Sequence, residues 1–137
     1  MDTDRNTLKI RFTSCTHRRR FTKLITDDGM YPGDSERASL FFLISGNEDL
    51  YKRRRHIYDT EEHCIRNCLD SGGIDFSSSM RSLIRLGFNL YNGWSDSHTT
   101  PLCILGCLDS NNLLLAGVAI MIRFSMEPIH ELQNALE

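Results

Sequence analysis

Three segments of helical length are apolar around most of their circumference, and they constrain the fold more than any other feature of this chain. They span residues 35–45, 80–91 and 112–124. A helix that is apolar on nearly all sides has to be covered by other elements, so all three belong at the centre of a fold. The sequence therefore predicts an all-α domain with these helices in its core.

Capping and turn residues divide the rest of the chain into shorter elements. Ser14 or Thr16 can cap a helix that ends near Thr26, and Asp34 and one of the serines 77–79 can cap two of the central helices. We predict a single domain over residues 1–137 with five to seven helices and a core at about 12–124. Outside the central helices, the predicted elements are a short strand or arm at 7–12, helices at 48–58, 101–108 and 127–136, and one or two helical turns at 60–67.

The composition is that of a globular protein in a reducing compartment. A chain of 137 residues with 40% hydrophobic residues can bury a core without disulfides or metals. The first residues, 1–4, are acidic and polar, unlike a signal peptide. The most apolar stretch, 113–122, is half the length of a membrane span and indicates a buried helix. We expect a cytoplasmic protein with free thiols, no cofactor and no membrane partner.

The basic residues gather in two short clusters in the first half of the chain. Residues 1–60 carry 12 Lys and Arg against 9 Asp and Glu, whereas residues 61–137 carry 4 against 9. Arginine presents a planar group suited to carboxylates, phosphates and interfaces. Both clusters are therefore candidate partner-binding sites, and we expect them to be exposed. The candidate residues are Arg18, Arg19, Arg20, Tyr51, Arg53, Arg54 and Arg55.

The cysteines allow two further hypotheses. Four of them form two pairs with a spacing of four residues, which puts each pair on one face of a helix and could supply zinc ligands. Aliphatic residues surround the second pair, which favours packing in a core instead. A cysteine with a histidine base is the enzymatic alternative, although no catalytic motif is present. The candidate ligands are Cys64, Cys68, Cys103 and Cys107.

Polar groups also accompany two of the central helices, at Asp34–Arg37 and at Asn89–Asn92. They could form a polar pocket between the helices. The alternative, which we favour, is that they act as caps and as a buried pair of an arginine and a carboxylate that fixes the packing.

Taken together, several segments resemble an uncharacterised family of small proteins from Firmicutes genomes, their prophages and their mobile elements. The likeness covers residues 12–124 and implies a helical domain in a bacterial or phage setting, with no assigned catalytic residue. The segments that carry it are His17–Phe21, Asp34–Arg37, Leu43–Asn47, Leu50–Tyr51, Phe76–Ser79 and Leu86–Gly93.

These observations favour a non-enzymatic protein-binding module. With the resemblance to mobile-element proteins, they suggest an inhibitor of a host defence enzyme, of the anti-CRISPR kind. The alternatives are a nucleic-acid-binding protein that uses the arginine clusters and an enzyme with a cryptic Cys/His or metal site. Homo-oligomerisation is compatible with each hypothesis.

Overall fold

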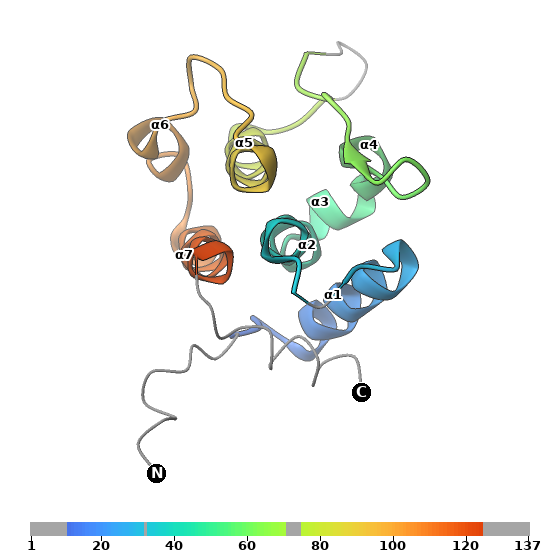
Figure 1. Ribbon diagram of the computed structural model, residues 1–137. Coiled ribbons are helices and arrows are strands. Elements are labelled where there is room, and N and C mark those ends of the chain that lie inside the picture. Colours follow the sequence, from blue (N-terminus) through green and yellow to red (C-terminus); the bar gives the residue numbers. More distant parts are fainter. Residues whose placement is uncertain (1–10, 32, 71–74, 125–137) are drawn as a thin grey trace.

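The fold of the chain is given by a computed structural model that describes residues 11–31, 33–70 and 75–124 (Figure 1). Within these residues the architecture is all-α, as predicted, with one two-stranded hairpin as the only sheet. The elements are α1 (Cys15–Asp28), α2 (Ser35–Gly46), α3 (Glu48–Lys52), α4 (Arg54–Ile57), β1 (Tyr58–Asp59), β2 (Cys64–Ile65), α5 (Ser78–Asn92), α6 (Pro101–Leu105) and α7 (Ser110–Phe124).

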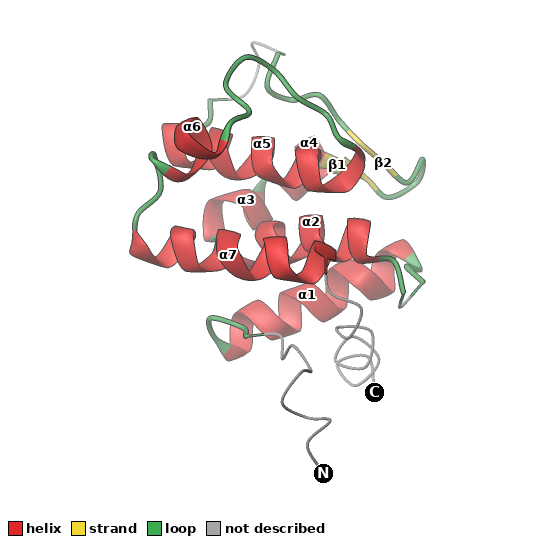
Figure 2. Ribbon diagram, turned by 60° about the vertical axis from the view of Figure 1, so that its left-hand side comes forward, coloured by secondary structure: helices red, strands yellow, loops and turns green. Residues whose placement is uncertain are grey.

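Helix α2 lies at the centre of the bundle. It packs against α1, α5 and α7, and α3 follows it directly. Figure 1 shows these helices surrounding α2, and Figure 2 shows α5 above α2, α1 below it and α7 in front of it. All eight residues from 38 to 45 are buried, which confirms that an all-round apolar helix is a central one.

The predicted caps are present at the starts of the main helices. The Asp34 side chain accepts a hydrogen bond from the N–H of Arg37, and Ser77 accepts one from Met80. Ser14 caps α1 in the same way. Each cap satisfies a backbone N–H that has no partner within its own helix, so these boundaries follow from local sequence.

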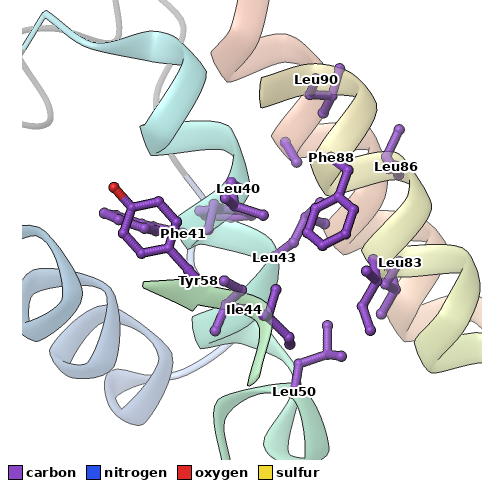
Figure 3. Packing of buried hydrophobic residues seen from close by; sticks show 14 of the residues in the cluster. Leu40, Phe41, Leu43, Ile44, Leu50, Tyr58, Leu83, Leu86, Phe88 and Leu90 are labelled. Carbon is purple, nitrogen blue, oxygen red and sulfur yellow. The ribbon is translucent and has the colours of Figure 1, made fainter. Parts of the chain in front are cut away.

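Close contact between α2 and α5 forms the middle of the core (Figure 3). Phe88 of α5 is fully buried, as are Leu40 and Leu43 of α2. Gly87 permits this contact, because a Cβ atom there would lie 2.8 Å from the Cδ1 of Leu40. A larger residue at this position would force the two helices apart.

The predicted helix at 48–58 is wrong only in its continuity and in its last residue. The chain turns at Arg53, so that α3 and α4 are separate short helices and Tyr58 begins a strand. The Arg54 guanidinium donates to the carbonyl of Tyr51 at 2.9 Å, which satisfies one of the carbonyls left over at the end of α3. The break also lets Tyr58 pack its ring edge-on against Phe41, with the ring centroids 5.0 Å apart.

The predicted helical turns at 60–67 are also wrong, because this segment is a tight antiparallel hairpin. Tyr58 pairs with Ile65, and Asp59 pairs with Cys64. The Asp59 carboxylate accepts from the N–H groups of residues 61 and 62, a local bond that competes with helix formation.

The last two described helices are less buried than the sequence indicates. Only Ile104 is buried in α6, which ends at Leu105 rather than near 108. In α7, Leu114 and Met121 are exposed, so the stretch 113–122 is buried on one side only. No described helix is long and apolar enough to cross a membrane. The predicted arm at 7–12 falls mostly outside the described residues, and the helix at 127–136 entirely so.

Candidate basic interface

The structure brings the two arginine clusters together at the ring of Tyr51. The guanidinium carbon of Arg54 lies 4.2 Å from the ring centroid, and that of Arg20, from α1, lies 4.6 Å from it. Both distances are those of cation–π contacts, and both arginines are half-buried rather than exposed as predicted. We call Arg20, Tyr51 and Arg54 the Tyr51 cluster.

A carboxylate at the start of α3 fixes one member of this cluster. Arg20 donates hydrogen bonds to both carboxylate oxygens of Glu48. The hydrogen bond raises the pKa of Arg20 and lowers the pKa of Glu48. Lys52 also lies within 3.7 Å of Glu48. The pair positions Arg20, while Arg54 has no carboxylate partner among the described residues.

The other arginines of the two clusters differ in exposure. Arg18, Arg19 and Arg55 are exposed, as expected, whereas Arg53 is half-buried with its guanidinium carbon 5.9 Å from the Phe76 ring centroid. Arg19 donates to the hydroxyl of Thr16. Arg55 has no hydrogen bond or ion pair with any described residue, so its charge is available to a partner.

A small cleft opens beside the Tyr51 cluster, between α1, α2 and α4. Its volume is about 130 Å³, with Phe41, Ile44 and Leu24 as apolar lining. Arg54, Arg55 and Lys23 add three cations, of which Lys23 pairs with Asp27 at 3.1 Å. The cleft is smaller than the roughly 300–1,000 Å³ of small-molecule sites, and its size suits a single side chain. We call it the basic cleft; the Asp27 carboxylate, Tyr58 and Thr60 complete its lining.

The structure does not bring the four paired cysteines together. Cys64 lies on β2 and Cys103 on α6, and across residues 11–31, 33–70 and 75–124 no three His, Cys, Asp or Glu side chains are grouped to hold a metal. Cys103 and Cys107 are exposed, which corrects the expectation of core packing. Cys68 is buried, and burial raises the pKa of its thiol to about 11.

A second polar cluster joins the hairpin to α1 and α2. The buried carboxylate of Asp28 contacts Nδ1 of His63 at 2.9 Å and Nε of Arg37 at 3.7 Å. Arg37 also donates to the Tyr58 hydroxyl and pairs with Asp34 at 2.7 Å. Asp34 caps α2 and pairs with Arg37, as predicted, but this pair is half-buried, and the buried carboxylate beside Arg37 is that of Asp28.

His63 is held in an unusual backbone conformation by this cluster. Its φ is +55°, in the left-handed region that costs a non-glycine residue about 1–3 kcal/mol. Its carbonyl accepts hydrogen bonds from Arg37 and from the hydroxyl of Tyr91. Burial raises the pKa of Tyr91, and it also raises that of Tyr58, where the hydrogen bond to Asp28 adds to the shift. These contacts anchor the hairpin and offset the strain.

Sequence reasoning found only part of this second cluster. It marked Asp34, Arg37 and the segment containing Tyr91, and it considered His63 only as the neighbour of Cys64, without a link to Asp28. Both lie in loops or at helix ends, 35 positions apart, and no local pattern links them. The Asp28–His63 bond engages the ring nitrogen of the histidine next to Cys64, so the proposed Cys/His pair has its histidine held by a carboxylate of α1.

The comparisons with known proteins give a family and no activity. A family model described as a family of unknown function, DUF6075, matches residues 7–135. The chain belongs to this family. The match confirms the resemblance to an uncharacterised family and extends over nearly the whole sequence. No curated protein and no solved structure matches the chain.

Proposed function

We propose that this DUF6075 member is a non-enzymatic protein-binding module that engages an acidic surface of its partner through the Tyr51 cluster and the basic cleft. The observation that carries the proposal is the convergence of both arginine clusters on Tyr51, next to a cleft with an apolar floor and cationic sides. Arginine and tyrosine are enriched at protein interfaces and supply much of their binding energy.

The cleft's chemistry supports an acidic side chain as the anchor of the partner. Arg55 is exposed without an ion-pair partner among the described residues, and Arg54 is without a carboxylate there. A carboxylate that entered between them would gain charge-assisted hydrogen bonds. Its aliphatic stem would lie on Leu24, Ile44 and Phe41.

The same region fits nucleic acid less well. Two guanidinium groups contact the Tyr51 ring and compete with a nucleobase for its faces. Carboxylates lie among the cations, at Glu48 and Asp27, so the positive charge does not form the continuous track that a phosphate backbone follows. The whole chain has a net charge of −2, so it lacks the broad excess of positive charge that phosphate backbones attract.

The biological setting that we propose rests on the sequence resemblance. A small protein of a phage or mobile element that binds an acidic host protein would act as an inhibitor of a defence enzyme, in the manner of anti-CRISPR proteins. The geometry supports the existence of the binding surface. The proposal that the partner is a defence enzyme of the host rests on the resemblance alone.

The direct test is a binding titration with two defined probes of equal charge. A glutamate-rich peptide and a DNA duplex are each added to the full chain, and backbone amide shifts are followed by NMR. We expect the peptide to shift residues 20, 23, 51, 54 and 55, and the duplex to bind more weakly. Tighter binding of the duplex at the same residues would favour the nucleic-acid alternative.

Two single charge reversals provide matched variants for this titration. Arg55→Glu removes a cation of the basic cleft that makes no other contact among the described residues. Arg11→Glu makes the same charge change at an exposed position that lies by Asn111 and Leu114 of α7. Arg55→Glu should weaken peptide binding about tenfold and Arg11→Glu should not. Equal effects of the two variants would mean that net charge alone accounts for peptide binding, which would contradict a specific site.

A further inference from the structure

One side of α7 is apolar and exposed in the part of the chain that the structure describes. Leu114 is 61% exposed, Met121 is 53% and Phe124 is 71%, and Leu113 is also exposed. A shallow groove of about 390 Å³ runs along this side of the helix and over Gly117. Exposed apolar surface of this extent marks a site of interaction. We call Leu113, Leu114, Gly117, Met121 and Phe124 the exposed apolar side of α7.

The residues that follow α7 have the sequence pattern of a helix with one apolar side. Residues 126–136 lie outside the described residues, and their sequence predicts a helix at 127–136. Their large apolar residues recur at steps of three, three and four, so on a helix they would share one side about 120° wide. These residues are Met126, Ile129, Leu132 and Leu136. The side opposite to them would carry the polar residues Glu127, His130, Glu131 and Asn134.

We propose that residues 128–136 form a helix that returns antiparallel to α7 and packs its apolar residues on the exposed apolar side of α7. Pro128 explains why the chain turns after Phe124, where α7 ends. If α7 continued, the proline ring would clash with the Phe124 carbonyl, four residues earlier, and would have no N–H to donate to it. Residues 125–127 then form the connection, and this length lies within the two to five residues typical of a helical hairpin.

The length of the returning helix matches the length of the groove. Residues 128–136 and residues 116–124 each span eight steps, which is about 12 Å of helix. A helix that starts level with Phe124 and returns antiparallel therefore places Leu136 level with residue 116, within one turn of Leu113. The apolar residues of the segment thus extend over the whole groove.

Gly117 provides a flat contact surface in the middle of α7. A Cβ atom placed there would meet no described atom within 4 Å, so packing within the described bundle does not require a glycine. A glycine in the middle of a helix costs about 1 kcal/mol relative to alanine. The missing side chain lets a second helix approach the backbone of α7 closely, which accounts for a glycine at this position.

The charges of the segment also suit this location. Residues 125–137 contain three glutamates and no lysine or arginine. Arg11 is exposed and lies beside Leu114, at the end of α7 toward which the returning helix leads. The negative end of the returning helix and the Glu137 carboxylate would therefore lie near this cation.

The short connection favours this segment over any separate molecule as the occupant of the groove. A segment tethered beside its binding surface by a few residues has an effective concentration in the millimolar range. The family model extends to residue 135, so the segment belongs to the same matched region as the bundle. The residues that line the basic cleft come from other elements than α7, so this inference is independent of the proposed function.

Isotope-edited NMR of the full chain tests the contact directly. We expect nuclear Overhauser effects between the methyl groups of Leu132 and Met121. An equal mixture of labelled and unlabelled chains then separates contacts within one chain from contacts between two chains. We expect no effect between two chains, because the segment packs on its own α7.

The oxidation rate of Met121 by hydrogen peroxide, followed by peptide mass mapping, provides a second readout. Leu132→Glu places a charge within the apolar side of the segment and should increase this rate at least about fivefold. Asn134→Glu makes the same charge change on the opposite side of the segment and should leave the rate unchanged. Met80 is buried in the bundle and provides the reference rate, which neither variant should change if the bundle stays folded.

Two outcomes would overturn the proposal. If Met121 is oxidised at the same rate in the original chain and in Leu132→Glu, the segment does not cover the exposed apolar side of α7. If the Overhauser effects are absent or arise only between two chains, another molecule or a second copy is the occupant. Acidic-peptide binding at the basic cleft would survive either outcome, and loss of that binding would leave the contact of the segment with α7 intact.

Discussion

His17 shows how a single polar residue is accommodated in the core. Its ring is buried, with Nε2 donating to the carbonyl of Phe42 at 3.0 Å and Nδ1 accepting from the N–H of Thr13 at 3.0 Å. These bonds use the neutral ring, and no room is left for a second proton. Burial lowers the pKa of His17 to about 4.

This burial predicts acid destabilisation in a defined pH range. The unfolded chain takes up a proton on His17 near pH 6.5, while the folded chain does so only near pH 4. Stability is therefore complete above about pH 6.5 and is lost as the pH falls toward 4, by about 2 kcal/mol at pH 4.5. Urea denaturation at pH 7 and pH 4.5 measures the loss. In His17→Gln the loss should be much smaller, and in His98→Gln, at an exposed position, it should be unchanged; equal losses in all three would contradict the assignment.

Substitution of Asp28 measures how much the second polar cluster contributes to the free energy of unfolding. Its carboxylate is 1% exposed and contacts His63, Arg37 and Tyr58. Asp28→Ala leaves these groups without a buried acceptor and should lower the free energy of unfolding by about 2–4 kcal/mol. Asp27→Ala, one residue earlier, removes only an exposed pair with Lys23 and should cost less than about 1 kcal/mol. Similar losses for the two variants would show that the cluster contributes little.

We expect the five cysteines to differ in their reactivity toward a thiol reagent. Cys15, Cys64, Cys103 and Cys107 are exposed, while Cys68 is buried with its pKa raised to about 11. Because the thiolate is the reactive form, titration of the native chain with a thiol reagent should modify four sites quickly and the fifth only on unfolding. Fast modification of all five sites in the native chain would contradict the burial of Cys68.

At the scale of elements, the contact between α2 and α5 depends on Gly87. Gly87→Ala adds a methyl group 2.8 Å from Leu40, which is itself buried, so the cost of overpacking should exceed the gain in helix propensity. We expect a net loss of about 1 kcal/mol by chemical denaturation. Ser78→Ala, at an exposed position of the same helix, serves as the control. A gain in stability from Gly87→Ala would mean that the two helices separate without penalty.

The elements that sequence reasoning predicted well are those with local signals. Asp34 and Ser77 cap their helices through bonds to residues three positions later, and Gly93 ends α5 in the left-handed conformation. Such signals are contained within one turn of chain. The apolar periodicity also identified α2 and α5 as core helices, whereas α7 is buried on one side only.

The elements that it predicted wrongly depend on contacts between distant residues. Nothing in residues 48–58 alone reports that the Tyr58 hydroxyl accepts a hydrogen bond from Arg37, 21 positions away. The candidate site likewise combines a local sequence signal with contacts between distant residues. The arginines were visible as two runs, but their convergence on Tyr51 depends on the packing of α1 beside α2 and α3.

At the scale of the whole molecule, the described part of the chain presents two unlike surfaces. The first surface combines arginines, Tyr51 and the basic cleft. The second is the exposed apolar side of α7, which carries Leu113, Leu114 and Met121. A compact helical core that positions two such surfaces is typical of a module that binds other macromolecules. The family match confirms the resemblance to an uncharacterised family and names no partner.

The most direct test of the account is a comparison of association rates for partners captured from host lysate. The full chain and Arg54→Glu/Arg55→Glu are each immobilised, with lysate treated or untreated with nuclease. We predict a protein that is captured in both lysates and that associates at least about tenfold more slowly with the variant, whose thermal melt stays close to that of the original chain. Capture lost after nuclease treatment, or an unchanged association rate for the variant, would contradict the account.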